Sequence, residues 1–184
     1  MLFIEQSLET LHSKFNNKKG VQVLSEQGNT ETVSCSFNSP IPDEKLTSFQ
    51  KEIGIELPKD YITFLKHHNG AKIFELLLGD TNIGGGLQLY SLVEIQSQLQ
   101  DAYLDKKFVP IGYVSESHLT INIEEIKKGN PNYLFLGNPA FEFRPLNLNF
   151  ELFFDRFIIS QGSNFWDWPI YTAQNYYELN RGIE

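Results

Sequence analysis

One stretch of this chain, residues 41–70, constrains the fold more than any other because both ends of two consecutive helices are marked in it. Pro42 suits a first helical position, where no backbone N–H is needed, and Asp43 and Glu44 place negative charge in the first turn. Gly54 is expected to end this helix. Its apolar stripe consists of Leu46, Phe49 and Ile53. The pattern predicts a short helix with one buried face.

A second helix is predicted immediately afterwards. Leu57-Pro58 restarts the chain, Asp60 lies in the new first turn, and Asn69-Gly70 offers a left-handed cap. Residues at helical spacing are Tyr61, Phe64, Leu65 and His68. The two segments therefore predict a helical hairpin that closes one apolar face over the remainder of the fold.

Short strands are predicted after Gly70. Ser91 to Glu94 forms a capping box that starts a helix reaching about Tyr103, and a late helix begins near Asn147 or Asn149. Expected strands cover residues 73–78, 87–90, 108–113, 118–123 and 133–136. Short strands with near-hairpin links predict an α+β fold, an antiparallel sheet meander with helices packed against it.

The 184 residues are expected to form one domain. Residues 1–40 read as a helix and a hairpin, which is either an edge of the same sheet or a small appended module, and we favour the edge. Residues 41–160 are expected to form the central part of the domain. Residues 161–184 are an aromatic C-terminal segment that either covers the sheet or forms a binding surface, and packing is the favoured role.

The amino-acid composition argues against some classes of binding partner. The net charge of −8 argues against nucleic acid or an anionic membrane as the main partner. Residues 71–126 contain 3 basic and 8 acidic residues, so this acidic middle region either faces a basic partner or is an ordinary solvated surface that keeps the protein soluble, and charge alone favours the second interpretation. No apolar run is long enough to span a membrane, the first residues lack a basic signal-peptide region, and Cys35 is alone. A cytoplasmic location is therefore expected.

No catalytic, cofactor or metal site is predicted. The glycines at 84–86 lack the Lys-Ser or Lys-Thr of a phosphate-binding loop, and adjacent His67 and His68 point about 100° apart on a helix. Glu124-Glu125 reads as a solvated turn. Strand 118–123 alternates Leu119, Ile121 and Ile123 with His118, Thr120 and Asn122, which predicts one buried and one polar face.

The order Gly-hydrophobic-x-Leu-Pro, Asp-Tyr-x-x-Phe-Leu and Asn-Gly within residues 54–70 resembles the signature of the SUKH superfamily, the Knr/Smi-like domain. The resemblance extends over roughly residues 40–160 through LQLYSLVEI, FVPIG and NFELFFDRFI. Many members carry a Gly-Gly-Asp-like turn after the FVPIG strand. This chain has residues 113–117, YVSES, there, so a ligand role of that turn is not carried over.

The resemblance implies a non-catalytic protein-binding module. Bacterial members are understood as immunity proteins, or antitoxins, that neutralise a cognate toxin, frequently a nuclease, whereas fungal relatives regulate cell-wall synthesis and signalling. A small-molecule sensor or enzyme with a pocket lined by Tyr90, Tyr113 and Trp166 is the other alternative. The expected protein-binding residues are Tyr90, Tyr113, Glu116, His118, Trp166, Asp167 and Trp168.

Overall fold

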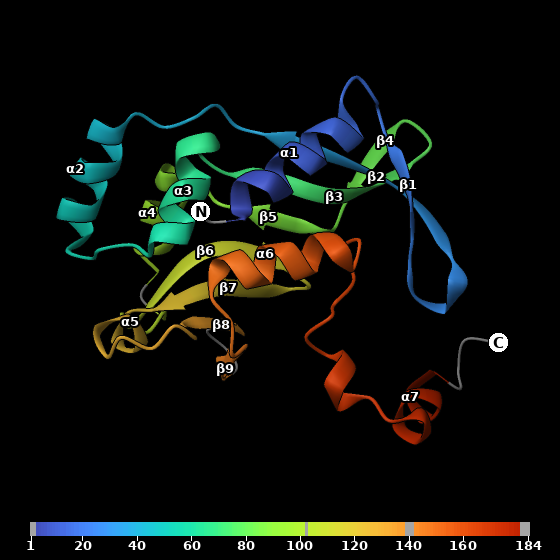
Figure 1. The fold of residues 1–184 in the computed structure, drawn as a ribbon. Helices are drawn as coiled ribbons and strands as arrows, with labels where there is room; N and C mark the ends of the chain where they lie inside the picture. Colours follow the sequence, from blue (N-terminus) through green and yellow to red (C-terminus); the bar gives the residue numbers. More distant parts are fainter. Residues whose placement is uncertain (1–2, 102, 139–141, 181–184) are drawn as a thin grey trace.

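The computed structural model describes residues 3–101, 103–138 and 142–180. The helices at residues 4–15, 59–67 and 150–159 lie against one face of a long twisted sheet, and the C-terminal segment extends beside the N-terminal hairpin (Figure 1). The α-helices are α1 (Ile4–Phe15), α2 (Asp43–Ile53), α3 (Lys59–His67), α4 (Leu92–Gln98), α5 (Ile123–Lys127), α6 (Phe150–Ile159) and α7 (Ala173–Asn180). The described residues also include the 3-10 turns η1 (Glu26–Gly28) and η2 (Trp168–Ile170).

Within the described residues, nine strands form one antiparallel sheet. They are β1 (Val21–Leu24), β2 (Thr30–Phe37), β3 (Ala71–Leu78), β4 (Thr81–Gly84), β5 (Leu87–Leu89), β6 (Phe108–Val114), β7 (Ser117–Asn122), β8 (Leu134–Gly137) and β9 (Arg144–Pro145). The strand order is β1-β2-β3-β5-β6-β7-β8-β9, and β4 pairs with β3. The predicted α+β class with an antiparallel meander is therefore confirmed.

The N-terminal hairpin joins this sheet. β2 pairs with β3 from Val33↔Leu76 to Phe37↔Ala71, which places β1 at an edge, as favoured from the sequence. The pairing is interrupted at Phe74, whose φ of 59° is unusual for a bulky residue. Gly86 faces this bulge, and a Cβ there would lie 2.3 Å from the Ile73 carbonyl oxygen. Glycine at 86 is therefore required by close backbone approach.

The predicted helical hairpin is present as α2 and α3. Gly54 caps α2 in the left-handed conformation, with φ 67°. Pro42 is the N-cap rather than the first helical residue, because its ψ of 141° is extended, and the same holds for Pro58. Gly70 does not cap α3, since His68 is already extended. Gly70 instead allows close backbone approach, because a Cβ there would lie 2.9 Å from the Leu89 carbonyl oxygen and 2.8 Å from the Ser91 nitrogen.

A buried polar network joins the start of α3 to the start of α6. The Asp60 carboxylate accepts hydrogen bonds from the Tyr133 hydroxyl at 2.5 and 2.6 Å and from the backbone N–H groups of Tyr61 and Glu151 at 3.0 Å each. The Tyr133 hydroxyl in turn accepts from the Phe150 N–H at 3.1 Å. Asp60 therefore acts as an N-terminal cap for a helix that begins 90 residues later.

Aromatic packing fills the space between the helices and the sheet. Phe64 of α3 is fully buried, and its ring lies 5.5 Å from that of Phe150 and 5.7 Å from that of Phe154. The apolar face predicted for the late helix is confirmed, and the Asn149 side chain, rather than that of Asn147, caps α6 by accepting from Leu152 N–H.

Two predicted boundaries were wrong. The capping box at Ser91 and Glu94 is present, but α4 ends at Gln98 because the Asp101 side chain accepts from the Tyr103 N–H and forms a competing local turn. Strand β7 ends at Asn122, whose side chain caps α5, so Glu124-Glu125 lies in a short helix rather than in a turn.

Candidate protein-binding site

The tip of the β6–β7 hairpin is the most constrained exposed feature near the expected binding residues. Val114 pairs with Ser117, so Ser115 and Glu116 form a two-residue turn, and both have positive φ, 48° and 61°. Such turns normally use Asn and Gly, and other residues are strained there. The Ser115 hydroxyl donates to Asn164 Oδ1 at 2.6 Å. The C-terminal segment therefore holds the turn while Glu116 stays exposed.

The strand register aligns a polar row across the sheet face opposite to α1, α3 and α6. Lys72 pairs with Gln88, Gln88 with Tyr113, and Tyr113 with His118. Directly opposed residues point to the same side of a sheet. The neighbouring positions Ile73 and Leu119 are fully buried in the core. The row joins residues from four strands, and the sequence pattern alone identified only its last two members.

Tyr113 and His118 form the centre of this row. Their ring centroids lie 5.4 Å apart in an edge-to-face arrangement, and Tyr113 is 38% exposed. Tyr90 lies beside them, with its ring 6.4 Å from that of His118, but it is only 6% exposed. Burial raises the Tyr90 pKa to about 12. Tyr90 therefore supports the site from beneath, and Tyr113 is the ring that a partner can reach.

The rest of the expected polar face of β7 is not exposed. Thr120 is fully buried and donates to the Phe135 carbonyl oxygen at 3.2 Å, and Asn122 is buried as the cap of α5. The reason is aromatic cover on this same side of the sheet. Phe108 lies 5.4 Å from Phe135 and stacks on Phe143 at 4.3 Å. The expectation of a solvent-facing polar strand was wrong beyond His118.

The two tryptophans of the C-terminal segment differ in role. Trp166 stacks on Phe153 at 5.7 Å and on Phe157 at 6.4 Å, so it packs against α6 rather than standing as an exposed anchor. Trp166 therefore lies on the α6 side of the sheet and Tyr113 on the opposite side, so these two residues do not line one pocket as the alternative small-molecule hypothesis required. Trp168 is 50% exposed and donates from Nε1 to Glu26 at 2.9 Å.

A hollow of about 560 Å³ lies under the β6–β7 turn. It is lined by Tyr113, Glu116, Arg144 and neighbouring residues of β8. Arg144 forms an ion pair with Asp167 at 2.7 Å, which ties the C-terminal segment to this wall. The structure thus brings Tyr113, Glu116 and His118 together, connects Asp167 to them through Arg144, and places Trp168 farther along the segment.

His118 adds a pH response to this region. Burial lowers its pKa below the ordinary 6.5, with Asp101 acting in the opposite direction, and its Nδ1 has no hydrogen-bond partner among the described residues. The unfolded state binds this proton more readily than the folded state does. The effect of His118 on the free energy of unfolding is therefore absent above about pH 6.5, and stability declines as the pH falls from there through the folded pKa.

We expect the urea concentration at the unfolding midpoint to decrease when the pH is lowered from 7.5 to 5.5. In His118→Gln this decrease should be smaller, because glutamine cannot take up the proton. Parallel urea unfolding curves of both proteins at the two pH values measure the effect. His68, whose pKa burial also lowers, remains in both proteins and accounts for a residual slope. Identical pH dependence in parent and variant would show that His118 does not contribute.

A cluster of metal ligands and a membrane-spanning helix are both absent from the described part of the chain. No group of three or more His, Cys, Asp or Glu side chains there is arranged to hold a metal ion. None of the helices found there is both long and apolar enough to cross a bilayer. Cys35 is half-buried, and burial raises its pKa to about 11, so it is not an activated nucleophile.

Comparison with known proteins agrees with this fold. The SMI1 / KNR4 family (SUKH-1) matches residues 40–156, which include the α2–α3 hairpin, the central strands and most of α6. The chain belongs to this family. The SUKH-1 chain is also 41% identical to the uncharacterized protein YobM of Bacillus subtilis (strain 168), covering 95% of this chain and 97% of YobM. It is 27% identical to the uncharacterized protein YnaB of the same strain, covering 81% and 97%.

Proposed function

We propose that this SUKH-1 protein is a non-catalytic immunity protein that binds a cognate basic toxin, of nuclease type, in the cytoplasm. The observation that carries the proposal is the strained, tethered β6–β7 turn, which presents Glu116 beside the exposed ring of Tyr113. Strained backbone that the surrounding structure maintains is concentrated at functional sites. Family membership supports a binding role, since SUKH proteins are generally non-catalytic.

The chemistry of the site suits inhibition by occlusion. A net charge of −8 attracts a positively charged protein and speeds encounter, while an aromatic side chain that enters a pocket on the partner slows release. Glu116 supplies the exposed acid and Tyr113 the anchor. Covering the basic substrate-binding cleft of a nuclease in this way blocks its substrate and requires no reaction by the inhibitor.

The test is co-expression with the toxin candidate encoded beside this gene, scoring growth rescue, followed by binding kinetics at two salt concentrations. Tyr113→Ala is expected to weaken binding by at least about 2 kcal/mol, roughly 30-fold, through faster dissociation. Glu116→Gln is expected to slow association and reduce its salt dependence, because it removes one charge without changing the shape of the turn.

Glu56→Gln is the matched control, because Glu56 is an exposed acid in the α2–α3 link, away from the β6–β7 turn. It removes the same charge and should leave the kinetics nearly unchanged. Full rescue and parental kinetics in both the Tyr113 and the Glu116 variants would place the interface elsewhere. Equal effects of the Glu56 and Glu116 variants would show that the net charge, and not the position of Glu116, determines the association rate.

A further inference from the structure

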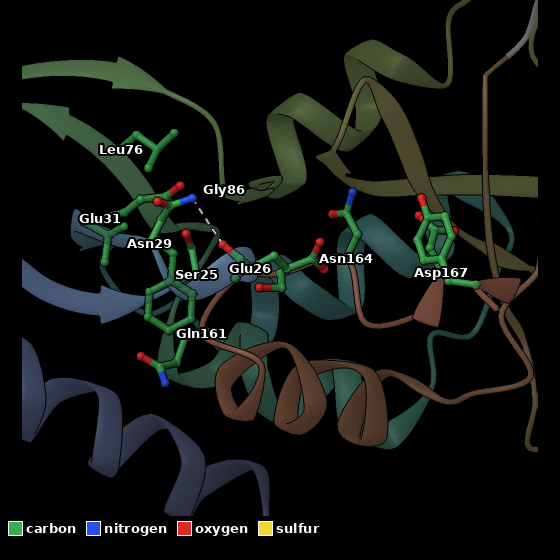
Figure 2. A pocket seen from close by; sticks show the side chains of 14 residues that line it. Ser25, Glu26, Asn29, Glu31, Leu76, Gly86, Gln161, Asn164 and Asp167 are labelled. Carbon is green, nitrogen blue, oxygen red and sulfur yellow. Dashed lines mark hydrogen bonds between the residues drawn. The ribbon is translucent and has the colours of Figure 1, made fainter. Parts of the chain in front are cut away.

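A second hollow, of about 380 Å³, lies between the N-terminal hairpin and the C-terminal segment (Figure 2). We call it the hairpin cavity. One wall is the β1–β2 hairpin, with Glu26 in its connection and Glu31 in β2, and the other is the chain after α6, including Asn164, Asp167 and Tyr171. The two walls are joined outside the cavity, where Gln27 Nε2 donates to the Tyr176 hydroxyl at 3.1 Å.

The polar lining of the hairpin cavity favours a cation with several hydrogen-bond donors. Three carboxylates line it, those of Glu26, Glu31 and Asp167, and no Lys, Arg or His is among the lining residues. The Trp168 indole engages one oxygen of Glu26, and Arg144 engages one oxygen of Asp167. Glu31 forms no ion pair among the described residues. Unpaired negative charge therefore faces the cavity.

The apolar parts of the cavity are independent of this charge and indicate the shape of the ligand. Phe74 and Leu76 contribute an apolar floor, against which an alkyl chain can pack. Tyr171, 40% exposed, lines the wall, and Trp168 and Ile170 beside it are 50% and 57% exposed. Exposed aromatic faces next to carboxylates are suited to stacking with a planar cation, and clustered exposed apolar side chains mark interaction surfaces.

We propose that the hairpin cavity receives an arginine side chain of the protein partner. The guanidinium supplies a fork of donors for the unpaired carboxylate of Glu31, and its three methylenes pack on the apolar floor, while Glu26 and Asp167 add negative charge farther along the cavity. Lysine matches the charge but neither the fork nor the plane. The inference deepens the proposed function, on which it rests for the assumption that the partner is a basic protein.

The test uses the full-length protein and no toxin. ¹H–¹⁵N spectra are recorded during titration with N-acetyl-arginine amide, with its neutral citrulline counterpart, and with N-acetyl-lysine amide. We expect saturable shifts of the Trp168 indole N–H and of the amides of residues 161–164 with the arginine compound, weaker ones with lysine, and none with citrulline. Glu31→Gln should weaken arginine binding by up to about fivefold, the range for an exposed ion pair.

Glu56→Gln serves as the control, since Glu56 does not line the hairpin cavity, and this variant should bind the arginine compound as the parent does. Equal shifts with citrulline, shifts confined to other regions, no saturable shift with arginine, or unchanged affinity in Glu31→Gln would each overturn the inference. Because no toxin takes part, this outcome is separate from growth rescue, whose failure would count against the proposed function instead.

Discussion

Replacing Phe64 by alanine is expected to lower the free energy of unfolding by about 3 to 5 kcal/mol. The ring is fully buried and lies against Phe150 and Phe154 of α6, so truncation leaves a cavity where α3 meets α6. Urea unfolding followed by circular dichroism measures the loss. An effect of this size is a large fraction of the stability of a typical domain.

Tyr103→Ala is the matched control, because it also removes an aromatic ring but at a position that is 86% exposed. Its unfolding free energy should stay within about 0.5 kcal/mol of the parent. If Phe64→Ala unfolds at the parental midpoint, the packing of α3 against α6 does not hold the fold together.

Asp60→Ala is expected to destabilise the protein by about 3 to 5 kcal/mol, because it leaves three buried donors without their acceptor. These donors are the Tyr133 hydroxyl and the backbone N–H groups of Tyr61 and Glu151. The carboxylate also lies at the start of both α3 and α6, where negative charge is favourable. The same unfolding measurement gives the magnitude.

A double-mutant cycle with Tyr133→Phe separates this network from simple loss of packing. Tyr133→Phe keeps the ring and removes only the hydroxyl, so it should cost about 1 to 3 kcal/mol. The double variant should lose less than the two single losses combined, with a coupling of about 0.5 to 3 kcal/mol. Strict additivity would mean that the Asp60–Tyr133 contact, although 2.5 Å long, does not contribute to stability.

Elements that depend on neighbouring residues were predictable from the sequence. The α2–α3 hairpin, the Ser91 capping box, the left-handed Gly54 and the apolar face of α6 all follow from contacts between residues a few positions apart. The order of short strands with short links likewise determined an antiparallel meander, since parallel pairing needs longer crossovers. Tyr113, Glu116 and His118 could be grouped as a candidate site from the sequence because they are close in the sequence as well as in space.

The remaining features depend on contacts between distant segments, which local patterns do not contain. Thr120 reads as a polar strand residue but is buried because Phe135 and Phe143 cover its side of the sheet. Trp166 packs against the core because its segment folds back onto α6, a contact between segments that no local pattern contains.

The hairpin cavity shows most clearly which features follow from local sequence and which depend on contacts between distant segments. Charge along the sequence pointed to residues 71–126, whereas the carboxylates that share a cavity come from residues 26, 31 and 167. Local rules determined the hairpin that carries the first two and the aromatic segment that carries the third. Only tertiary packing, through the Trp168–Glu26 and Gln27–Tyr176 hydrogen bonds, brought the two walls together.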